Sequence, residues 1–371
     1  MISFVQSDKN AVEIRKLISY IAPGAPATRC CAKGDEPFLR PEVGFTPSWF
    51  RQTLDIDFGE RFHLDPAYRA AGTTKMRREL RRRFPGTAIG GIHKLDRPLD
   101  ILTGTFGTCT LAAIYGIPIH YAENNWPASV HQYLTDEQLA RLEPPNLDRN
   151  PHFQQLMDQL AWIGQQEGAV EGFVNWQGIL NNAHRLRGEM LFLNMKEEPE
   201  LARHVFACVC ETMISAIRRL HAVQKSSRID CPFITVSNCS VNMISPKTYE
   251  EFLLPFDQKL AEVYGCIGIH NCAWSATPYL HAYAMVPHVG YIDMGIKSNL
   301  ALAKSLFPNS RRALMYTPMD LVTRSIEAIR LDIEKIAEEY GPADLVLADI
   351  EAGTPDEKVK AFLTICEEWN Q

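Results

Sequence analysis

Short apolar runs alternate with amphipathic stretches along most of this chain. Residues 320–340 illustrate the second kind, because Ile326, Ile329, Ile333 and Ile336 recur at helical spacing and form one stripe. Residues 264–271 illustrate the first kind, with Ile267 and Ile269 as in a buried strand. The alternation predicts strands over residues 87–91, 172–176, 232–239, 264–271, 289–294, 312–316 and 345–348.

Amphipathic stretches fill the intervals between these strands. They predict helices over residues 9–22, 65–84, 109–115, 134–142, 150–167, 199–222, 248–264, 320–340 and 356–369, and a helix start near Pro47 with Ser48 as its N-cap. Strands separated by helices indicate a parallel sheet, and the number of units favours a (β/α)8 TIM barrel in the α/β class. We expect residues 86–371 to form this barrel. We expect residues 1–85 to form an N-terminal helical arm that packs on the barrel, with irregular structure over residues 31–66.

Composition narrows the class of protein. The chain has 371 residues, of which 46% are hydrophobic and 22% charged, as in a globular protein. A net charge of −6 argues against nucleic acid as the main partner. No apolar run of about 18 residues predicts a membrane span, and no signal peptide precedes the first helix. Ten cysteines without such a signal indicate reduced thiols in a cytoplasm.

The residues His270 and Cys272 follow the apolar strand over 264–271. Residues two apart in a strand point to one face, so the imidazole and the thiol should project together. This pair can bind a thiophilic divalent metal, of which zinc is the commonest, or can be a packed histidine beside an inert cysteine. Cys30, Cys31, Cys208 and Cys210 lack the spacing of a structural zinc site, and we interpret them as packing or incidental residues.

Polar residues cluster at the ends of the other predicted strands, where a barrel carries its active site. Some have equally plausible structural roles: the asparagines can cap turns, the tryptophans can pack, and Asp293 can satisfy a buried hydrogen bond. Thr354 and Glu357 are expected to cap the last helix, which leaves the two carboxylates before them free for a site. The strand-end set comprises Asn175, Trp176, Asn238, Cys239, Asn242, Trp274, Asp293, Tyr316, Asp349 and Glu351.

Several motifs resemble one family. Residues 245–256, SPKTYEEFLLPF, resemble the "lSPe-x-(F/Y)-x-eF-x-x-Py" segment of the uroporphyrinogen decarboxylase-like superfamily, and the His-x-Cys strand follows as it does there. Residues 104–110 resemble its "G-x-x-G-P-x-T" turn, and residues 353–359 its "g-T-P-x-E-N-v" close. The resemblance implies a (β/α)8 barrel, in agreement with the strand count.

Two branches of the superfamily can be separated on the residues. The "M-R-Q-A-G-R" run of true uroporphyrinogen decarboxylases is replaced by WFRQTL at 49–54, and their "G-H-G" is absent. The methylcobalamin-dependent branch, which includes methylcobalamin:coenzyme M methyltransferases, carries His-x-Cys as zinc ligands. Its third ligand is a cysteine before the Thr-Pro, which this chain lacks. Asp349 or Glu351 would replace that cysteine, or Cys239 would reach in from a neighbouring strand.

The resemblance therefore implies a cytoplasmic zinc-dependent methyltransferase. It would move a methyl group between a small-molecule donor or thiol acceptor and a corrinoid, cobalamin, on a partner protein. A carboxylate is the expected third ligand beside His270 and Cys272, with Asp293, Tyr316 and Glu351 as catalytic residues. The expected substrate-binding residues are Asn175, Trp176, Asn238, Asn242 and Trp274. Two alternatives are a metal-free decarboxylase and a non-catalytic corrinoid- or tetrapyrrole-binding protein. Members of the superfamily often dimerise, so a homodimer is a further expectation.

Overall fold

Six parallel strands form the main sheet of the computed structural model, which describes residues 31, 32, 34, 36–87, 89, 90, 98–230 and 233–371. The strand order is β1–β8–β7–β6–β5–β4, and every neighbouring pair is parallel, as predicted. A short antiparallel pair lies apart from this sheet. The strands are β1 (Leu39–Phe45), β2 (Ile119–His120), β3 (Ala128–Ser129), β4 (Ile234–Ser237), β5 (Ile267–His270), β6 (Val289–Gly295), β7 (Arg311–Met315) and β8 (Ala343–Ile350).

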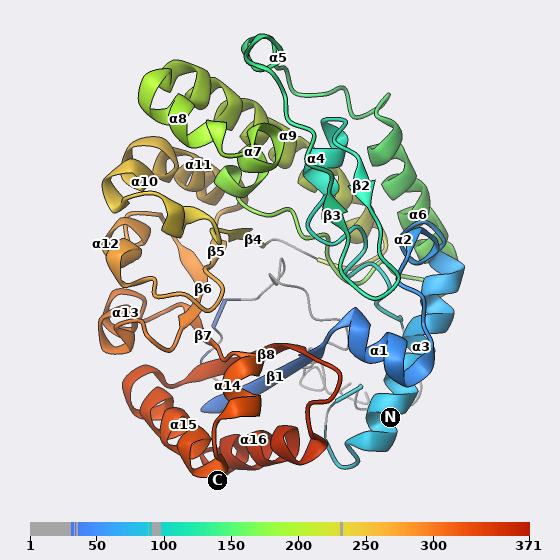
Figure 1. Ribbon diagram of the computed structural model, residues 1–371, viewed down its shortest axis with the longest axis vertical. Coiled ribbons are helices and arrows are strands. Elements are labelled where there is room, and N and C mark those ends of the chain that lie inside the picture. The colour runs from blue at the N-terminus through green and yellow to red at the C-terminus, as the bar shows by residue number, and fades with distance from the viewer. Residues whose placement is uncertain (1–30, 33, 35, 88, 91–97, 231–232) are drawn as a thin grey trace, which may run out of the picture.

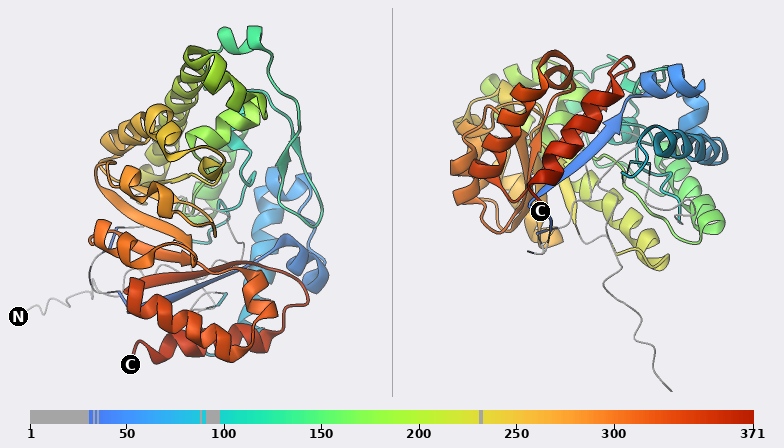
Figure 2. Two further views of the ribbon diagram at one scale, coloured as in Figure 1. Left: turned by 60° about the vertical axis from the view of Figure 1, so that its left-hand side comes forward. Right: turned by 90° about the horizontal axis from the view of Figure 1, so that it is seen from below.

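Helices surround the sheet. Figure 1 shows the strands as an arc inside a ring of helices, and Figure 2 shows the ring from two other sides. The helices are α1 (Pro47–Leu54), α2 (Glu60–Leu64), α3 (Pro66–Arg83), α4 (Thr110–Ile114), α5 (Asp136–Ala140), α6 (Pro151–Glu167), α7 (Ile179–Arg187), α8 (Met190–Glu197), α9 (Pro199–Ser226), α10 (Pro246–Phe252), α11 (Leu254–Tyr264), α12 (Leu280–Tyr283), α13 (Leu300–Leu306), α14 (Pro318–Thr323), α15 (Ile326–Tyr340) and α16 (Asp356–Glu368), with 3-10 turns η1 (Val241–Met243) and η2 (Thr277–Tyr279).

Side chains alternate between the two faces of each strand. Ile267 and Ile269 of β5 belong to the large core shared with the helices, so Gly268 and His270 face the other way. That inner face carries a separate small cluster: Phe233, Tyr291, Ala313, Met315, Val346 and Ala348. Asp293 lies two residues after Tyr291 and therefore also faces inward. The period of two thus sends His270 and Asp293 into the same enclosed space.

The structure corrects the N-terminal prediction. Residues 39–45 were expected to be irregular, but they form β1, which pairs with β8. Pro41 and Gly44 weaken the strand signal in the sequence, and proline is tolerated because β1 is the last strand of the described sheet. The N-cap of α1 is Thr46, not Ser48, since its hydroxyl accepts from the Trp49 N–H. The helix expected over 9–22 lies outside the described residues. The division near residue 85 stays a prediction.

Two expected strands are not strands. Residues 172–176 form no ladder, because side chains take its place: Gln224 Nε2 donates to the Gly172 carbonyl, and the Phe173 N–H donates to Thr103 Oγ1. The described residues of 87–91 lie in turns.

Several helix expectations also need correction. The helix over 248–264 is two helices that meet at Leu253, and the helix over 320–340 is broken before Ser325, which caps α15. Helix α16 has Pro355 as its N-cap and no side-chain cap, so the prediction of a capping box formed by Thr354 and Glu357 was wrong. Helices α2, α7, α8, α12 and α13 were not predicted. Across the described residues, no helix combines the length and the apolar character needed to cross a bilayer.

Candidate metal centre

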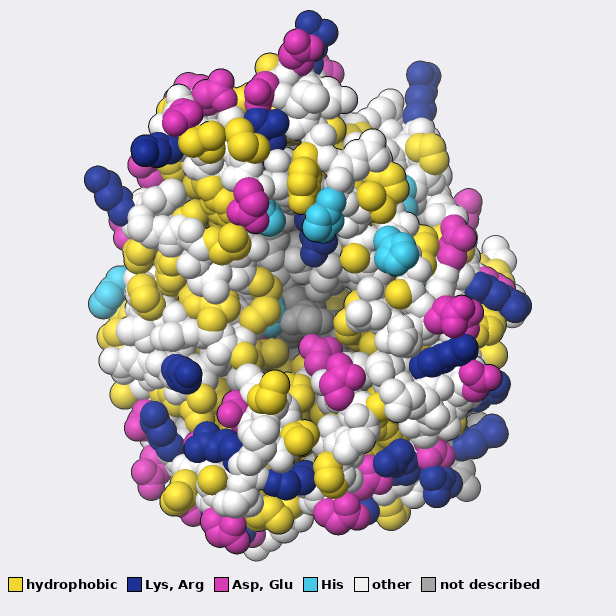
Figure 3. Space-filling model, viewed as in Figure 1, with side chains coloured by type: hydrophobic (Ala, Val, Ile, Leu, Met, Phe, Trp, Pro, Cys, Tyr) yellow, Lys and Arg dark blue, Asp and Glu magenta, His cyan; other side chains and the backbone are white. Residues whose placement is uncertain are grey.

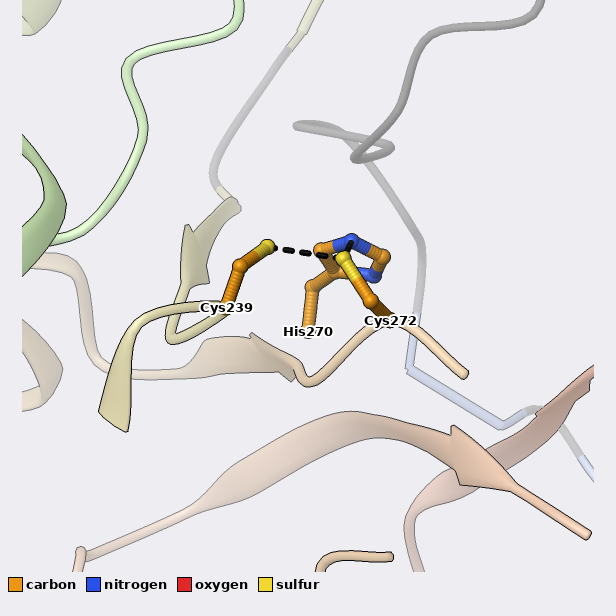
Figure 4. Close-up of side chains that lie close together, drawn as sticks. All are labelled: Cys239, His270 and Cys272. Atoms are coloured by element: carbon orange, nitrogen blue, oxygen red, sulfur yellow. Dashed lines mark hydrogen bonds between the residues drawn. The ribbon is translucent and has the colours of Figure 1, made fainter. Parts of the chain in front are cut away.

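Three side chains of types that can bind a metal meet beyond the carboxyl ends of β4 and β5. Ser237 of β4 is in register with His270 of β5, and each strand continues for two residues to a cysteine. Cys239 and Cys272 therefore occupy equivalent positions, and their Sγ atoms lie 2.8 Å apart. Cys272 Sγ lies 3.1 Å from His270 Nε2. Figure 4 shows the three side chains pointing toward one another, and their ligand atoms all lie within 4.8 Å of one another.

A buried carboxylate fixes the orientation of the histidine. His270 Nδ1 donates to Asp293 Oδ2 at 2.6 Å, and both side chains are fully buried. Asp293 also accepts from the Asn271 N–H at 2.8 Å and from the Tyr291 hydroxyl at 2.8 Å. Because Nδ1 is occupied by this bond, Nε2 is the ring nitrogen that faces the sulfurs. A carboxylate behind a histidine in this way is the usual support of a metal-binding imidazole.

The three side chains of this group shift one another's pKa values. The hydrogen bond from Cys272 and the charge of His270 hold the pKa of Cys239 well below its ordinary value, although burial opposes this. The same bond and burial raise the pKa of Cys272. Burial lowers the pKa of His270, but Asp293 and the two sulfurs outweigh it, so the pKa lies well above its usual value. These directions favour negative charge on the sulfur of Cys239 beside the imidazole of His270.

Close backbone contacts hold the two cysteine loops. A Cβ on Gly295 would lie 1.9 Å from the Ala273 carbonyl oxygen, and one on Gly178 would lie 2.4 Å from the Ser237 oxygen. Both glycines thus permit an approach that no larger residue allows. Cys272 itself has a left-handed φ of 54°, which turns the chain directly after β5. Such a conformation in a non-glycine residue is strained and is common at functional sites.

The structure brings together only part of the predicted set. Within the described residues, the candidate metal group consists of Cys239, His270 and Cys272, and no carboxylate belongs to it. Cys239, which was the open alternative to a carboxylate, lies beside His270 and Cys272, and its role as a third ligand stays a prediction. Asp293 is the partner of the histidine and lies behind it.

The two carboxylates after β8 have other contacts. Asp349 has a left-handed φ of 59° and accepts from Trp126 Nε1 at 3.4 Å. Burial raises its pKa, while Trp126 and the charge of His270 oppose the rise. Glu351 is exposed and accepts from Thr46 Oγ1 at 3.2 Å.

The predicted substrate-binding residues are placed in several ways. Asn238 is buried, its N–H donates to the His270 carbonyl at 2.7 Å, and its Nδ2 donates to Asp257 Oδ2 at 3.0 Å. Asn175 is buried and accepts from Gln177, and the neighbouring Trp176 is buried as well. Asn242 is exposed on η1. Asn238 therefore supports the ends of β4 and β5, whereas Asn175 stabilises the loop before α7.

Two predicted aromatic residues lie in packing positions. The Tyr316 hydroxyl donates to Asp332 Oδ2 on α15 at 2.8 Å, and its ring packs on Phe362, so the phenol lies in the helix layer. Trp274 is half-buried and packs edge-on against Tyr279, while its Nε1 is buried without a partner in the described part of the chain.

Supporting residues around the group were missed from the sequence. Asn271 Nδ2 donates to the Asp293 carbonyl, and its Oδ1 accepts from Tyr283. Asp257 accepts from Asn238 and from Tyr249, and burial raises its pKa to about 6. In the sequence, the spacing of two between Tyr291 and Asp293 was the one signal that these side chains lie on the same face of a strand. No sequence signal marked Asp257, which lies on α11.

Comparisons with known proteins fit this geometry. Residues 87–369 match the family described as Uroporphyrinogen decarboxylase (URO-D). The chain belongs to this family. The chain is 27% identical over 188 residues to the Methylated-thiol--coenzyme M methyltransferase of Methanosarcina mazei. The match covers 47% of this chain and 46% of that protein, so the chain spans about half the length of this curated relative.

A solved structure is similar to this chain over nearly its whole length. It is a methyltransferase from Methanosarcina mazei, with a TM-score of 0.64 at 15% identity, covering 91% of this chain and 95% of that one. It confirms the predicted TIM-barrel class. Together these findings confirm the resemblance to the superfamily and its similarity to the methyltransferase branch.

The three side chains suit zinc. Two sulfurs and one imidazole nitrogen are ligands that zinc prefers, and three protein ligands leave a fourth position for a substrate. The tautomer required for coordination through Nε2 is already set by Asp293. The lowered pKa of Cys239 also favours the thiolate form that a metal needs.

Proposed function

We propose that this protein is a methyltransferase that moves a methyl group between a small thiol and a corrinoid carried by a partner protein. Zinc would be held by Cys239, His270 and Cys272. The observation that supports this most is the convergence of two sulfurs and one carboxylate-backed imidazole at a single barrel end. The likeness to a methylated-thiol:coenzyme M methyltransferase points to the reaction class. A cytoplasmic location and a homodimer stay predictions.

Zinc bound at this site would lower the pKa of a thiol that occupies its fourth position and so supply a nucleophilic sulfur at neutral pH. The protein's own residues prepare that position. Asp293 holds His270 Nδ1, which keeps the imidazole from rotating. The Asn238 N–H bond to the His270 carbonyl holds the two strand ends together, so the sulfurs of Cys239 and Cys272 stay on one side.

The transfer forms one bond from carbon to the thiol sulfur and breaks the bond from that carbon to its donor. The electron pair of the broken bond leaves with the donor, and the thiol gives up its proton. Asp349 is our candidate to take this proton, since burial raises its pKa and His270 is near enough to influence its charge. The hollow at the centre of the ring of helices, visible in Figure 3, is where both reactants would meet.

Zinc content and methyl transfer test this proposal together. Protein purified with zinc should hold one ion per chain, and His270→Ala should hold none, while the exposed His281→Ala serves as the matched control and keeps it. With methylcobalamin as donor and 2-mercaptoethanesulfonate as acceptor, the wild type and the control should form the methyl thioether and His270→Ala should not. Equal zinc content in all three proteins would contradict the proposed site. Decarboxylation of an acid substrate that survives chelation, with no methyl transfer, would instead favour the metal-free decarboxylase class.

A further inference from the structure

A second cysteine pair lies at the opposite end of β5. Cys266 directly precedes the strand, and its Sγ lies 3.1 Å from the Sγ of Cys31, which is 235 residues away in sequence. Cys31 is exposed and Cys266 is half-buried, so small reagents can reach the pair. Sequence spacing alone does not pair these two residues, and it predicts Cys31 to be a packing or incidental residue. The candidate metal centre does not involve either residue.

The surroundings of this pair are shaped for two sulfur atoms. A Cβ on Gly290 of β6 would lie 2.3 Å from each of the two sulfurs, so only the absence of a side chain there lets both settle on the strand. The ring of Phe233 borders the same spot, 2.9 Å from that Cβ position. Cys266 also packs on the inner cluster of the barrel. No histidine or carboxylate is bonded to either thiol in the described contacts.

The remaining cysteines of the described chain differ from this pair. Cys109, Cys208, Cys210 and Cys366 are buried. The thiols of Cys109 and Cys208 donate to backbone carbonyls at 3.4 Å and 3.3 Å. Only two pairs of sulfurs in the described residues are in contact, and only the pair at the amino end of β5 lacks a histidine.

We propose that Cys31 and Cys266 form a reversible disulfide when the protein meets a small oxidised disulfide such as oxidised glutathione. The contact of 3.1 Å is about 1 Å longer than a sulfur–sulfur bond, so a small rotation of the side chains closes it. The exposed Cys31 thiolate attacks the reagent, which releases one small thiol and leaves a mixed disulfide. Cys266 then displaces the second small thiol. Two protein thiols and one small disulfide thus become one protein disulfide and two small thiols.

The bond would tie residue 31 to the amino end of the barrel. It closes a loop of more than two hundred residues in the unfolded chain, and the loss of unfolded-state freedom stabilises the folded form. We expect the melting temperature to rise by about 5 °C on oxidation. Reversal by a small thiol fits a protein of a reducing compartment, where lasting disulfides are rare.

The test treats the full-length zinc-loaded protein with oxidised glutathione and maps disulfide-linked peptides by mass spectrometry without reduction. We expect one linked peptide pair containing residues 31 and 266, reversed by dithiothreitol, together with the rise in melting temperature. Cys31→Ser should abolish both, and Cys208→Ser should change neither. Gly290→Ala keeps both thiols but pushes them apart, so it should greatly reduce the link.

Two results would overturn this proposal. One is the presence of glutathione adducts on Cys31 or Cys266 with no linked peptide. The other is a link to Cys266 that persists in Cys31→Ser, which would assign it to the adjacent Cys30. Neither result bears on the methyltransferase proposal, because zinc content and methyl transfer are measured separately and depend on residues at the other end of the strand.

Discussion

One strand, β5, carries a cysteine pair at each end, and the two pairs have different neighbours. At the carboxyl end, Cys272 meets Cys239 at 2.8 Å beside the imidazole of His270. At the amino end, Cys266 meets Cys31 at 3.1 Å over the bare backbone of Gly290. The two ends are separated by the length of β5, which is about 13 Å for four strand residues. We call them the upper pair and the lower pair.

The neighbours decide what each pair can do. The hydrogen bond from Cys272 and the His270 charge lower the pKa of Cys239, which favours the thiolate form that the proposed zinc would need. Burial and the hydrogen bond with Cys31 raise the pKa of Cys266 to about 12, which disfavours the thiolate form of this residue that a metal would need. Two thiols in contact are therefore not a metal site by themselves. The imidazole and the carboxylate behind it make the difference.

The largest expected effect separates the two pairs directly. Cys239→Ser or Cys272→Ser should weaken zinc binding by about a thousandfold, because each removes one of three protein ligands. Cys31→Ser and Cys266→Ser are matched substitutions at the lower pair and should leave the zinc affinity unchanged. Competition with a chromophoric chelator measures all four variants. Similar losses of zinc affinity at both pairs would contradict the proposal that only the upper pair binds zinc.

A buried carboxyl beneath the upper pair should make stability depend on pH. The pKa of Asp257 is raised from 3.8 to about 6 by burial, so the folded state favours its protonated form. Stability from this group is greatest below pH 4 and falls as the pH rises to 6, by about 3 kcal/mol in all. Urea unfolding of zinc-free protein across this range should show the fall. Asp257→Asn should remove it, and an unchanged pH profile in that variant would refute the assignment.

A smaller effect is expected at the carboxylate that orients the imidazole. Asp293→Asn should weaken zinc binding by about 10- to 100-fold. The asparagine keeps the shape of the side chain, but His270 Nδ1 loses a charged hydrogen-bond partner. Asp257→Asn is the control, because that side chain is equally buried but is bonded to Asn238. Isothermal titration with zinc compares the two variants. Equal affinities would mean that Asp293 is only a packing group.

The smallest expected effect concerns thiol protection. Free zinc at about ten times its dissociation constant should slow alkylation of the upper pair by about tenfold, because zinc-bound sulfur is not free to react. The lower pair should react at the same rate with and without zinc. Peptide mapping after a timed pulse of iodoacetamide gives both rates in one experiment. Protection of Cys31 by zinc would show that the pairs share a ligand.

Much of the fold and part of the site could be predicted from the sequence. His270 and Cys272 are two apart at a strand end, so strand periodicity alone places them on one side. Cys239 could be named but not chosen over a carboxylate, because its position opposite Cys272 depends on the register between β4 and β5. Asp257 belongs to helix α11, and Cys31 lies 235 residues from its partner. Contacts of this kind arise only when distant segments pack.

The strand at residues 39–45 was missed for a related reason. Its proline and glycine lower the local strand propensity, and its pairing with β8 joins segments about 300 residues apart. Residues 172–176 show the opposite error. Their apolar pattern suits a strand, but Gln224 and Thr103 satisfy the backbone instead of a neighbouring strand. Strand propensity is a property of one segment, whereas a β-ladder requires hydrogen bonds between two segments.

X-ray absorption at the zinc edge tests the central claim most directly. For zinc-loaded protein we predict a first shell with two sulfur ligands at about 2.3 Å and one imidazole nitrogen at about 2.0 Å, plus one light atom. The sulfur count should drop to one in Cys239→Ser. A shell with one sulfur and a carboxylate oxygen in the unaltered protein would contradict the account, since it would put Asp349 or Glu351 in the place given to Cys239.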